Sequence, residues 1–133
     1  MRSAFLLTCC LLASIPIVAE RPAAAMDARV AKTLLRVDPD TRLEQVCDIE
    51  AMHRVGKGNN FKPDRAKSDI SIHPIHQGDT MKAPGAAFRS KGRWYALSFE
   101  CTGTPDHLRV VSFSYKVGDP IPRSRWPDLG LWG

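Results

Sequence analysis

The clearest alternation of hydrophobic and polar positions runs from Ala86 to Val117. A two-residue turn at Lys91–Gly92 fits this pattern, because glycine readily takes the positive φ that such turns require. The turn would pair Phe88 with Tyr95 and Ala86 with Leu97. Along the second strand, one face would carry Tyr95, Leu97, Phe99 and Cys101, and the other Trp94, Ala96, Ser98 and Glu100. This period of two predicts a half-buried antiparallel sheet.

A third strand is predicted after the turn-forming residues 103–107. A four-residue loop would place Cys101 opposite Val110, on the wrong face. A three-residue loop, or a bulge at Thr102–Gly103, would pair Cys101 with Val111, and we expect one of these two. The resulting core face would consist of Tyr95, Leu97, Phe99, Cys101, Val111, Phe113 and Tyr115.

Two helices are predicted before the strands, over residues 26–35 and from residue 41 to about Val55. Pro39 separates them, because proline cannot continue the preceding helix. Thr41 and Glu44 fit a capping box, and Gly56 or Gly58 would end the second helix. On a helical wheel one continuous sector holds Leu43, Val46, Cys47, Glu50, Ala51 and Arg54.

Two further segments show weaker patterns. Residues 59–85 are polar and interrupted by prolines, which predicts a long loop with a short strand around 69–72. The last residues hold several large hydrophobic side chains, namely Trp126, Leu129, Leu131 and Trp132. We expect this tail to dock on the body and seal one edge or face of the sheet; the alternative is an exposed aromatic patch that binds a sugar or a partner.

The N-terminus has the layout of a secretory signal peptide: one arginine, a hydrophobic run from Ala4 to Ala19, and small residues before a cleavage site. Cleavage after Ala25 would divide the chain into a signal peptide, residues 1–25, and a single domain, residues 26–133. Cleavage near Ala19 is the alternative. The protein is therefore expected in the periplasm or outside the cell, and the mature chain is not expected to span a membrane.

Removal of residues 1–25 lowers the formal charge from +5 to +4 and leaves two cysteines, Cys47 and Cys101. In an oxidising compartment an even pair predicts a disulfide. The phase of the pattern agrees, because Cys101 lies on the core face and Cys47 in the helix sector that would face it. The predicted fold is α+β: two N-terminal helices packed on a small antiparallel β-meander, stapled by one disulfide.

Candidate chemistry is sparse. Glu50 and Arg54 lie four residues apart, in the favourable acid-first order for an ion pair on one helix. An arginine so placed stabilises the charged carboxylate, so we interpret the pair as structural rather than as a general acid or base. His73 and His76 are weak candidates for a metal site, because Pro74 between them leaves no helix to orient the two rings.

The chain resembles domain-of-unknown-function family 930, which is found in exported bacterial proteins. The segments that carry the resemblance are Arg42–Arg54, Pro63–Asp69, Gly85–Pro122 and Gly130–Trp132, and the two cysteine-bearing segments are the most specific. The resemblance implies an exported single domain. It carries over no activity, cofactor or catalytic residue.

The sequence shows no nucleophile–base motif, nucleotide-binding loop or strong metal-ligand spacing. We therefore interpret the protein as a non-enzymatic binding or structural module of the cell envelope, without a cofactor. The expected partner is an anionic envelope polymer or a protein, and not a nucleic acid. One alternative is a small, metal-assisted hydrolase that uses His73, His76 or Glu50. Another is a reader of anionic polymer or lipid, through Lys62, Arg65, Lys67, Arg89, Lys91 and Arg93.

Overall fold

The computed structural model describes residues 27–58 and 60–133, so the predicted signal peptide lies outside the described residues. Its elements are the helices α1 (Ala28–Leu34) and α2 (Pro39–Lys57), the strands β1 (Pro63–Lys67), β2 (Ile75–Gln77), β3 (Thr80–Ser90), β4 (Arg93–Gly103) and β5 (Val110–Pro120), and the short 3-10 helices η1 (Arg123–Arg125) and η2 (Pro127–Leu129). No helix within the described part of the chain is long and apolar enough to cross a membrane.

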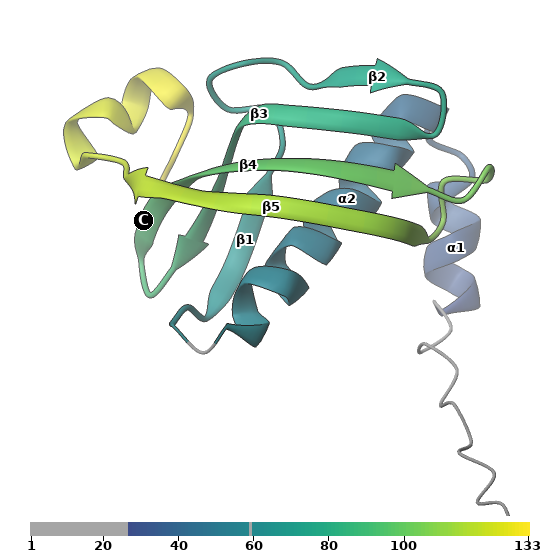
Figure 1. The fold of residues 1–133 in the computed structure, drawn as a ribbon, viewed down its shortest axis with the longest axis horizontal. Coiled ribbons are helices and arrows are strands. Elements are labelled where there is room, and N and C mark those ends of the chain that lie inside the picture. The colour runs from purple at the N-terminus through teal and green to yellow at the C-terminus, as the bar shows by residue number, and fades with distance from the viewer. Residues whose placement is uncertain (1–26, 59) are drawn as a thin grey trace, which may run out of the picture.

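The strands form one antiparallel sheet in the order β1-β3-β4-β5. β2 pairs with the far end of β3, on the same side as β1, so the two short strands make one interrupted edge. Helix α2 packs on one face of the sheet, and the C-terminal segment folds back at the end of the sheet away from α1 (Figure 1). The predicted α+β fold, with two N-terminal helices on an antiparallel sheet, is confirmed.

The start of α2 differs from the predicted capping box at Thr41. Asp38 is the N-cap, its carboxylate accepts the backbone N–H of Thr41 at 3.0 Å, and Pro39 occupies the first turn. Proline fits there because its missing N–H would have no partner within the helix. Pro39 therefore separates the helices, as predicted, and also opens the second one.

Arg42 connects three parts of the chain. Its guanidinium donates to the carbonyl oxygens of Leu34 (2.9 Å), Val37 (2.8 Å) and Asp106 (2.8 Å). Carbonyls at the end of a helix have no partner within it. Arg42 supplies these partners to the end of α1 and at the same time ties α1 and α2 to the β4–β5 loop.

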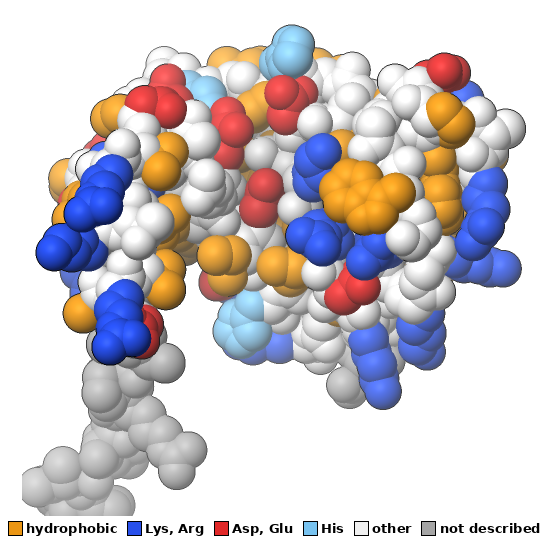
Figure 2. Space-filling model, turned by 180° about the vertical axis from the view of Figure 1, so that it is seen from behind, with side chains coloured by type: hydrophobic (Ala, Val, Ile, Leu, Met, Phe, Trp, Pro, Cys, Tyr) orange, Lys and Arg blue, Asp and Glu red, His pale blue; other side chains and the backbone are white. Residues whose placement is uncertain are grey.

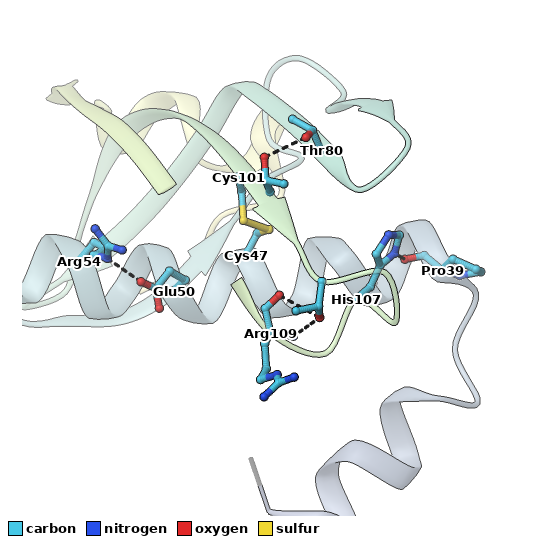
Figure 3. Close-up of a disulfide and its surroundings, with 10 residues drawn as sticks. Pro39, Cys47, Glu50, Arg54, Thr80, Cys101, His107 and Arg109 are labelled. Atoms are coloured by element: carbon cyan, nitrogen blue, oxygen red, sulfur yellow. Dashed lines mark hydrogen bonds and ion pairs between the residues drawn. A yellow bond between two sulfur atoms is a disulfide. The ribbon is translucent and has the colours of Figure 1, made fainter. Parts of the chain in front are cut away.

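The main core lies between α2 and the sheet. The helix contributes the buried residues Leu43, Val46, Cys47, Ala51 and Val55. Cys47 is joined to Cys101 of β4, with the two Cα atoms 6.1 Å apart and both residues fully buried (Figure 3). The predicted disulfide is present, and the cysteine-bearing face of α2 faces the sheet.

The predicted hairpin at Lys91–Gly92 is confirmed. Both turn residues have positive φ, and Phe88 pairs with Tyr95 and Ala86 with Leu97. The register of the next strand is a correction. The bulge at Thr102–Gly103 is present, but Cys101 pairs with Phe113 and Gly103 with Val110. Val111 is therefore 65% exposed, and Val110 packs against the core in its place.

The predicted loop over residues 59–85 is mostly wrong. It contains β1, β2 and the first half of β3, whereas residues 69–72 are not a strand. Pro63 begins an edge strand, and Pro84 lies where the β3–β4 register shifts between Ala83 and Ala86. These are positions at which a sheet tolerates proline, because no ladder N–H is lost there.

The C-terminal tail docks, as predicted. Trp126 and Leu131 are buried with Trp94 and Ala87 in a second, smaller core on the sheet face opposite α2. Trp94 is fully buried for this reason, although Ser98 and Glu100 further along the same face are polar. The tail covers only this end of the outer face, and the rest of that face stays open.

Candidate binding surface

Glu50 and Arg54 form an ion pair through the Arg54 Nε and a Glu50 carboxylate oxygen (Figure 3). Their side chains are 23% and 40% exposed, so the pair lies at the rim of the helix–sheet interface rather than in the core. Tyr115 donates its hydroxyl to the Arg54 carbonyl at 3.2 Å, and the Arg54 guanidinium lies 5.9 Å from the centre of the Phe113 ring. These contacts attach α2 to the edge strand β5, which is a structural role.

His73 and His76 are not brought to one site. His73 Nδ1 lies 2.9 Å from the Asp69 carboxylate, and its side chain is 92% exposed. His76 Nε2 lies 2.8 Å from Glu44 of α2. Among residues 27–58 and 60–133, no three His, Cys, Asp or Glu side chains are grouped so that they could hold a metal ion. The two loop histidines therefore bind different carboxylates and do not share one site.

Asp48 on α2 was not predicted as a candidate. One of its carboxylate oxygens is buried without a hydrogen-bond partner. Burial raises the pKa of Asp48 to about 7, with Glu44 adding to the rise, while hydrogen bonds from Ser68 and the charge of Lys67 oppose it. The only sequence signal was its place directly after Cys47, at the border of the buried helix sector.

His107, which was not predicted as a candidate, holds the β4–β5 loop. His107 is buried, with Nδ1 2.7 Å from the Pro39 carbonyl and Nε2 2.9 Å from the Asp79 carboxylate. Both neighbours are hydrogen-bond acceptors, one a backbone carbonyl and the other a carboxylate. His107 thus ties the loop to the start of α2 (Figure 3). Through Asp79 it also ties the loop to the β2–β3 turn.

The basic residues that the sequence singled out are partly gathered in space. Arg65 and Lys67 of β1 have their charged groups 5.7 Å and 5.5 Å from the centre of the Trp132 ring. Trp132 remains 45% exposed. On the face seen in Figure 2, Lys and Arg side chains gather around one large exposed hydrophobic side chain, on the side where the chain ends. We call Arg65, Lys67, Arg89 and Trp132 the Trp132 patch.

Arg89 fixes the floor of the Trp132 patch. Its guanidinium binds Asp64 in a bidentate manner, at 3.0 Å and 2.9 Å, and lies 5.9 Å from the centre of the Trp94 ring. These hydrogen bonds lower the pKa of the Asp64 carboxyl. The Trp94 indole N–H in turn donates to the Trp132 carbonyl at 2.7 Å. The exposed ring of Trp132 is therefore held by its backbone and is not a free chain end.

The remaining cations of the predicted group lie elsewhere. Lys62 contributes its backbone N–H to the Ser90 hydroxyl, and Lys91 forms the hairpin turn. Arg93 directly precedes Trp94 and lines a separate, smaller cleft.

A larger hollow, of about 460 Å³, lies over the open part of the outer sheet face. It is lined by Ile75, Lys82, Pro84, Ser98, Phe99, Glu100, Ser114, Tyr115 and Lys116. Lys82 lies 3.6 Å from Glu100, so of the charged groups that line the hollow only Lys116 is left without this pairing. It is also wide open to solvent, and its rim lacks the combination of an exposed tryptophan with several cations.

Taken together, the fold and these surfaces define a small α+β domain with one disulfide. Helix α2 packs on one face of the sheet, and on the other face Trp132 lies between cationic side chains. The chain belongs to the DUF930 family, described as Domain of Unknown Function, whose family model matches residues 34–131. No curated protein and no solved structure matches the chain. The resemblance noted in the sequence is thereby confirmed.

Proposed function

We propose that this protein is exported to the periplasm or the cell exterior and works there as a non-enzymatic module that binds an anionic polysaccharide. The observation that carries the proposal is Trp132, nearly half exposed and flanked by Arg65 and Lys67. The C–H face of a sugar ring packs on a flat indole, and the neighbouring cations attract the carboxylate or phosphate groups of the polymer.

A polysaccharide fits this surface better than a membrane does. A lipid surface is usually bound through several hydrophobic side chains that enter it together. The Trp132 patch offers one large ring, and the other tail residues with large side chains, Trp126 and Leu131, are buried. The ring also has a fixed position, which favours a defined contact with a repeating unit.

Export is supported by two observations of different kinds. The first is the signal-like N-terminus described above. The second is the disulfide between Cys47 and Cys101, since disulfides persist in oxidising compartments. Cell fractionation followed by intact-mass measurement tests this: we expect a mature chain that begins at Met26. A full-length chain in the cytoplasm would contradict it.

The binding proposal is tested with polygalacturonate, a polymer of charged sugars, against neutral dextran. Binding to polygalacturonate should weaken steeply as salt rises, because about 0.1 M salt screens charges beyond roughly 10 Å. Trp132→Ala and the double variant Arg65→Gln/Lys67→Gln should each weaken it roughly 5- to 30-fold. A matched control is Lys57→Gln/Lys116→Gln, which removes the same charge at exposed positions outside the patch.

The outcomes separate the possibilities. If the control double variant weakens binding as much as Arg65→Gln/Lys67→Gln, net charge alone explains the binding and the site is wrong. Equal binding to dextran would overturn the anionic ligand. Tight binding to phosphatidylglycerol vesicles without binding to polygalacturonate would identify a lipid reader in place of a polysaccharide reader.

A further inference from the structure

A second, smaller cleft lies beside the Trp132 patch, where η1 meets the ends of β4 and β5. Its volume is about 220 Å³, and it is lined by Arg93, Trp94, Pro120, Ile121, Arg123 and Trp126. Sites for drug-sized molecules occupy about 300–1,000 Å³. This cleft therefore has room for one sugar unit or a smaller group, and not for a folded peptide.

The walls of the cleft are apolar although two of them are tryptophans. The indole N–H of Trp94 donates to the Trp132 carbonyl at 2.7 Å, and that of Trp126 donates to the Ile121 carbonyl at 2.9 Å. Both indole donors are thus occupied within the protein. Trp94 is fully buried and Trp126 is only 7% exposed, so little of either ring is open to solvent, and Pro120 and Ile121 supply the more exposed apolar surface of the cleft.

The polar groups at the rim are two arginines. Arg93 and Arg123 are exposed, and neither takes part in a salt bridge in the described part of the chain. Asp119, which precedes Pro120 of the cleft in sequence, does not pair with either arginine. The Arg123 guanidinium lies 4.9 Å from the centre of the Trp126 ring. Stacking of this kind orders the side chain before a ligand arrives and lowers the entropy lost on binding.

The backbone that carries these residues is also fixed. Arg93 directly follows the Lys91–Gly92 turn, in which both residues have positive φ. The Ile121 N–H donates to the Trp94 carbonyl at 2.8 Å, which holds the start of the tail against β4. Arg93 and Arg123, which both line the cleft, are therefore carried on backbone that is held in place.

We propose that this cleft binds a single anionic sugar unit, with its carboxylate or phosphate between Arg93 and Arg123 and its ring against the exposed apolar surface of Pro120 and Ile121. Guanidinium groups bind both anions through two parallel N–H···O hydrogen bonds. This inference rests on the proposed function, because it assigns one charged unit of the polysaccharide to the cleft while neighbouring units lie along the Trp132 patch. Trp94 connects the two sites, since its ring lines the cleft and lies 6.0 Å from that of Trp132.

The test uses three small probes with the same ring: glucose 1-phosphate, glucuronate and glucose. The indole N–H signals of the three tryptophans are followed by NMR during titration of the ¹⁵N-labelled mature protein. We expect the two charged sugars to shift the Trp94 and Trp126 signals more than that of Trp132. Glucose should bind at least about tenfold more weakly, because a charged partner contributes most of the hydrogen-bond energy.

The matched variants are Arg93→Gln/Arg123→Gln and, as a control, Arg125→Gln. Arg125 belongs to the same short helix as Arg123 and is exposed, but it does not line the cleft. The double variant should weaken binding of the charged sugars at least about tenfold, and the control less than about twofold. Because all three arginines are exposed, the variants should fold like the parent, and an unchanged far-UV circular dichroism spectrum without ligand will show this.

Three results would overturn the inference. The first is equal binding of glucose, and the second is an equal loss of binding in Arg125→Gln. The third is a chemical-shift change confined to the Trp132 indole signal. This result would leave the proposed function standing but contradict binding of the sugar in the cleft. Conversely, charged sugars could bind the cleft while Trp132→Ala leaves the affinity for polygalacturonate unchanged. That result would refute the polymer-binding role of the Trp132 patch and retain the cleft.

Discussion

Asp48 offers the sharpest test of how this domain balances burial against charge. Its carboxyl group is mostly buried beside Ser68, and one oxygen has no hydrogen-bond partner. Replacement by asparagine keeps the shape of the side chain and removes the titration. We expect Asp48→Asn to stabilise the protein at alkaline pH and to change little at acid pH.

The sign follows from the direction of the shift. Burial raises the pKa of Asp48 from 3.8 to about 7, so between these values the folded state holds a proton that the unfolded state has released. The stability that this group contributes is fully present below about pH 4 and is lost as the pH rises through about 7. The difference between the two pKa values corresponds to roughly 4 kcal/mol, an upper limit because a charged carboxylate draws in water.

The measurement is the free energy of unfolding of both proteins by urea, followed by tryptophan fluorescence from pH 4 to pH 8.5. The advantage of Asp48→Asn over the parent should grow across this range by at least about 1 kcal/mol and by no more than roughly 4 kcal/mol. Asp64→Asn is the control, because Arg89 lowers the pKa of Asp64 below 3.8, so its contribution is lost only at more acid pH and its difference from the parent should stay constant from pH 4 to pH 8.5. A difference in the free energy of unfolding between Asp48→Asn and the parent that stays constant from pH 4 to pH 8.5 would refute the burial of a charge at this position.

Two further predictions concern the connections between elements. Replacing Cys47 and Cys101 together by alanine should lower the free energy of unfolding by about 4 kcal/mol, because the disulfide closes a loop of 54 residues in the unfolded chain; a loss below about 1 kcal/mol in urea unfolding would contradict this. Arg42→Lys cannot donate to three separate carbonyls at once, so amide hydrogen exchange should speed up in residues 28–34 while the α2–sheet core stays protected. Unchanged exchange in that segment would show that Arg42 does not hold α1.

The parts of the fold that could be predicted depend on short-range chemistry. The hairpin at Lys91–Gly92 has only one register once its two-residue turn is recognised, and the alternation of the two strands then places Cys101 on the core face. The register of β5 could not be obtained in this way. It depends on His107, which binds Pro39 and Asp79 from elsewhere in the chain, and on Gly103, where a Cβ atom would lie 2.8 Å from Leu43.

The strand β1 was missed for a different reason. An edge strand packs only a few side chains, and in Pro63–Lys67 only Ala66 is buried. Its other positions are polar, so the segment lacks the hydrophobic alternation that reveals β3 and β4. Proline at its start strengthened the interpretation as a loop, although an edge strand tolerates proline there.

The candidate surface depends on β1, and this explains why the sequence could name its residues without grouping them. Arg65 and Lys67 alternate on an edge strand that was not predicted, and Trp132 reaches them from the end of the chain. Docking of the tail and exposure of an aromatic patch were posed as alternatives, but they are one arrangement. Burial of Trp126 and Leu131 fixes the path of the tail, and that path places the Trp132 ring, 45% exposed, against the two cations. A tail that failed to dock would therefore lose the patch as well, so the stability of the smaller core and the affinity of the surface should change together.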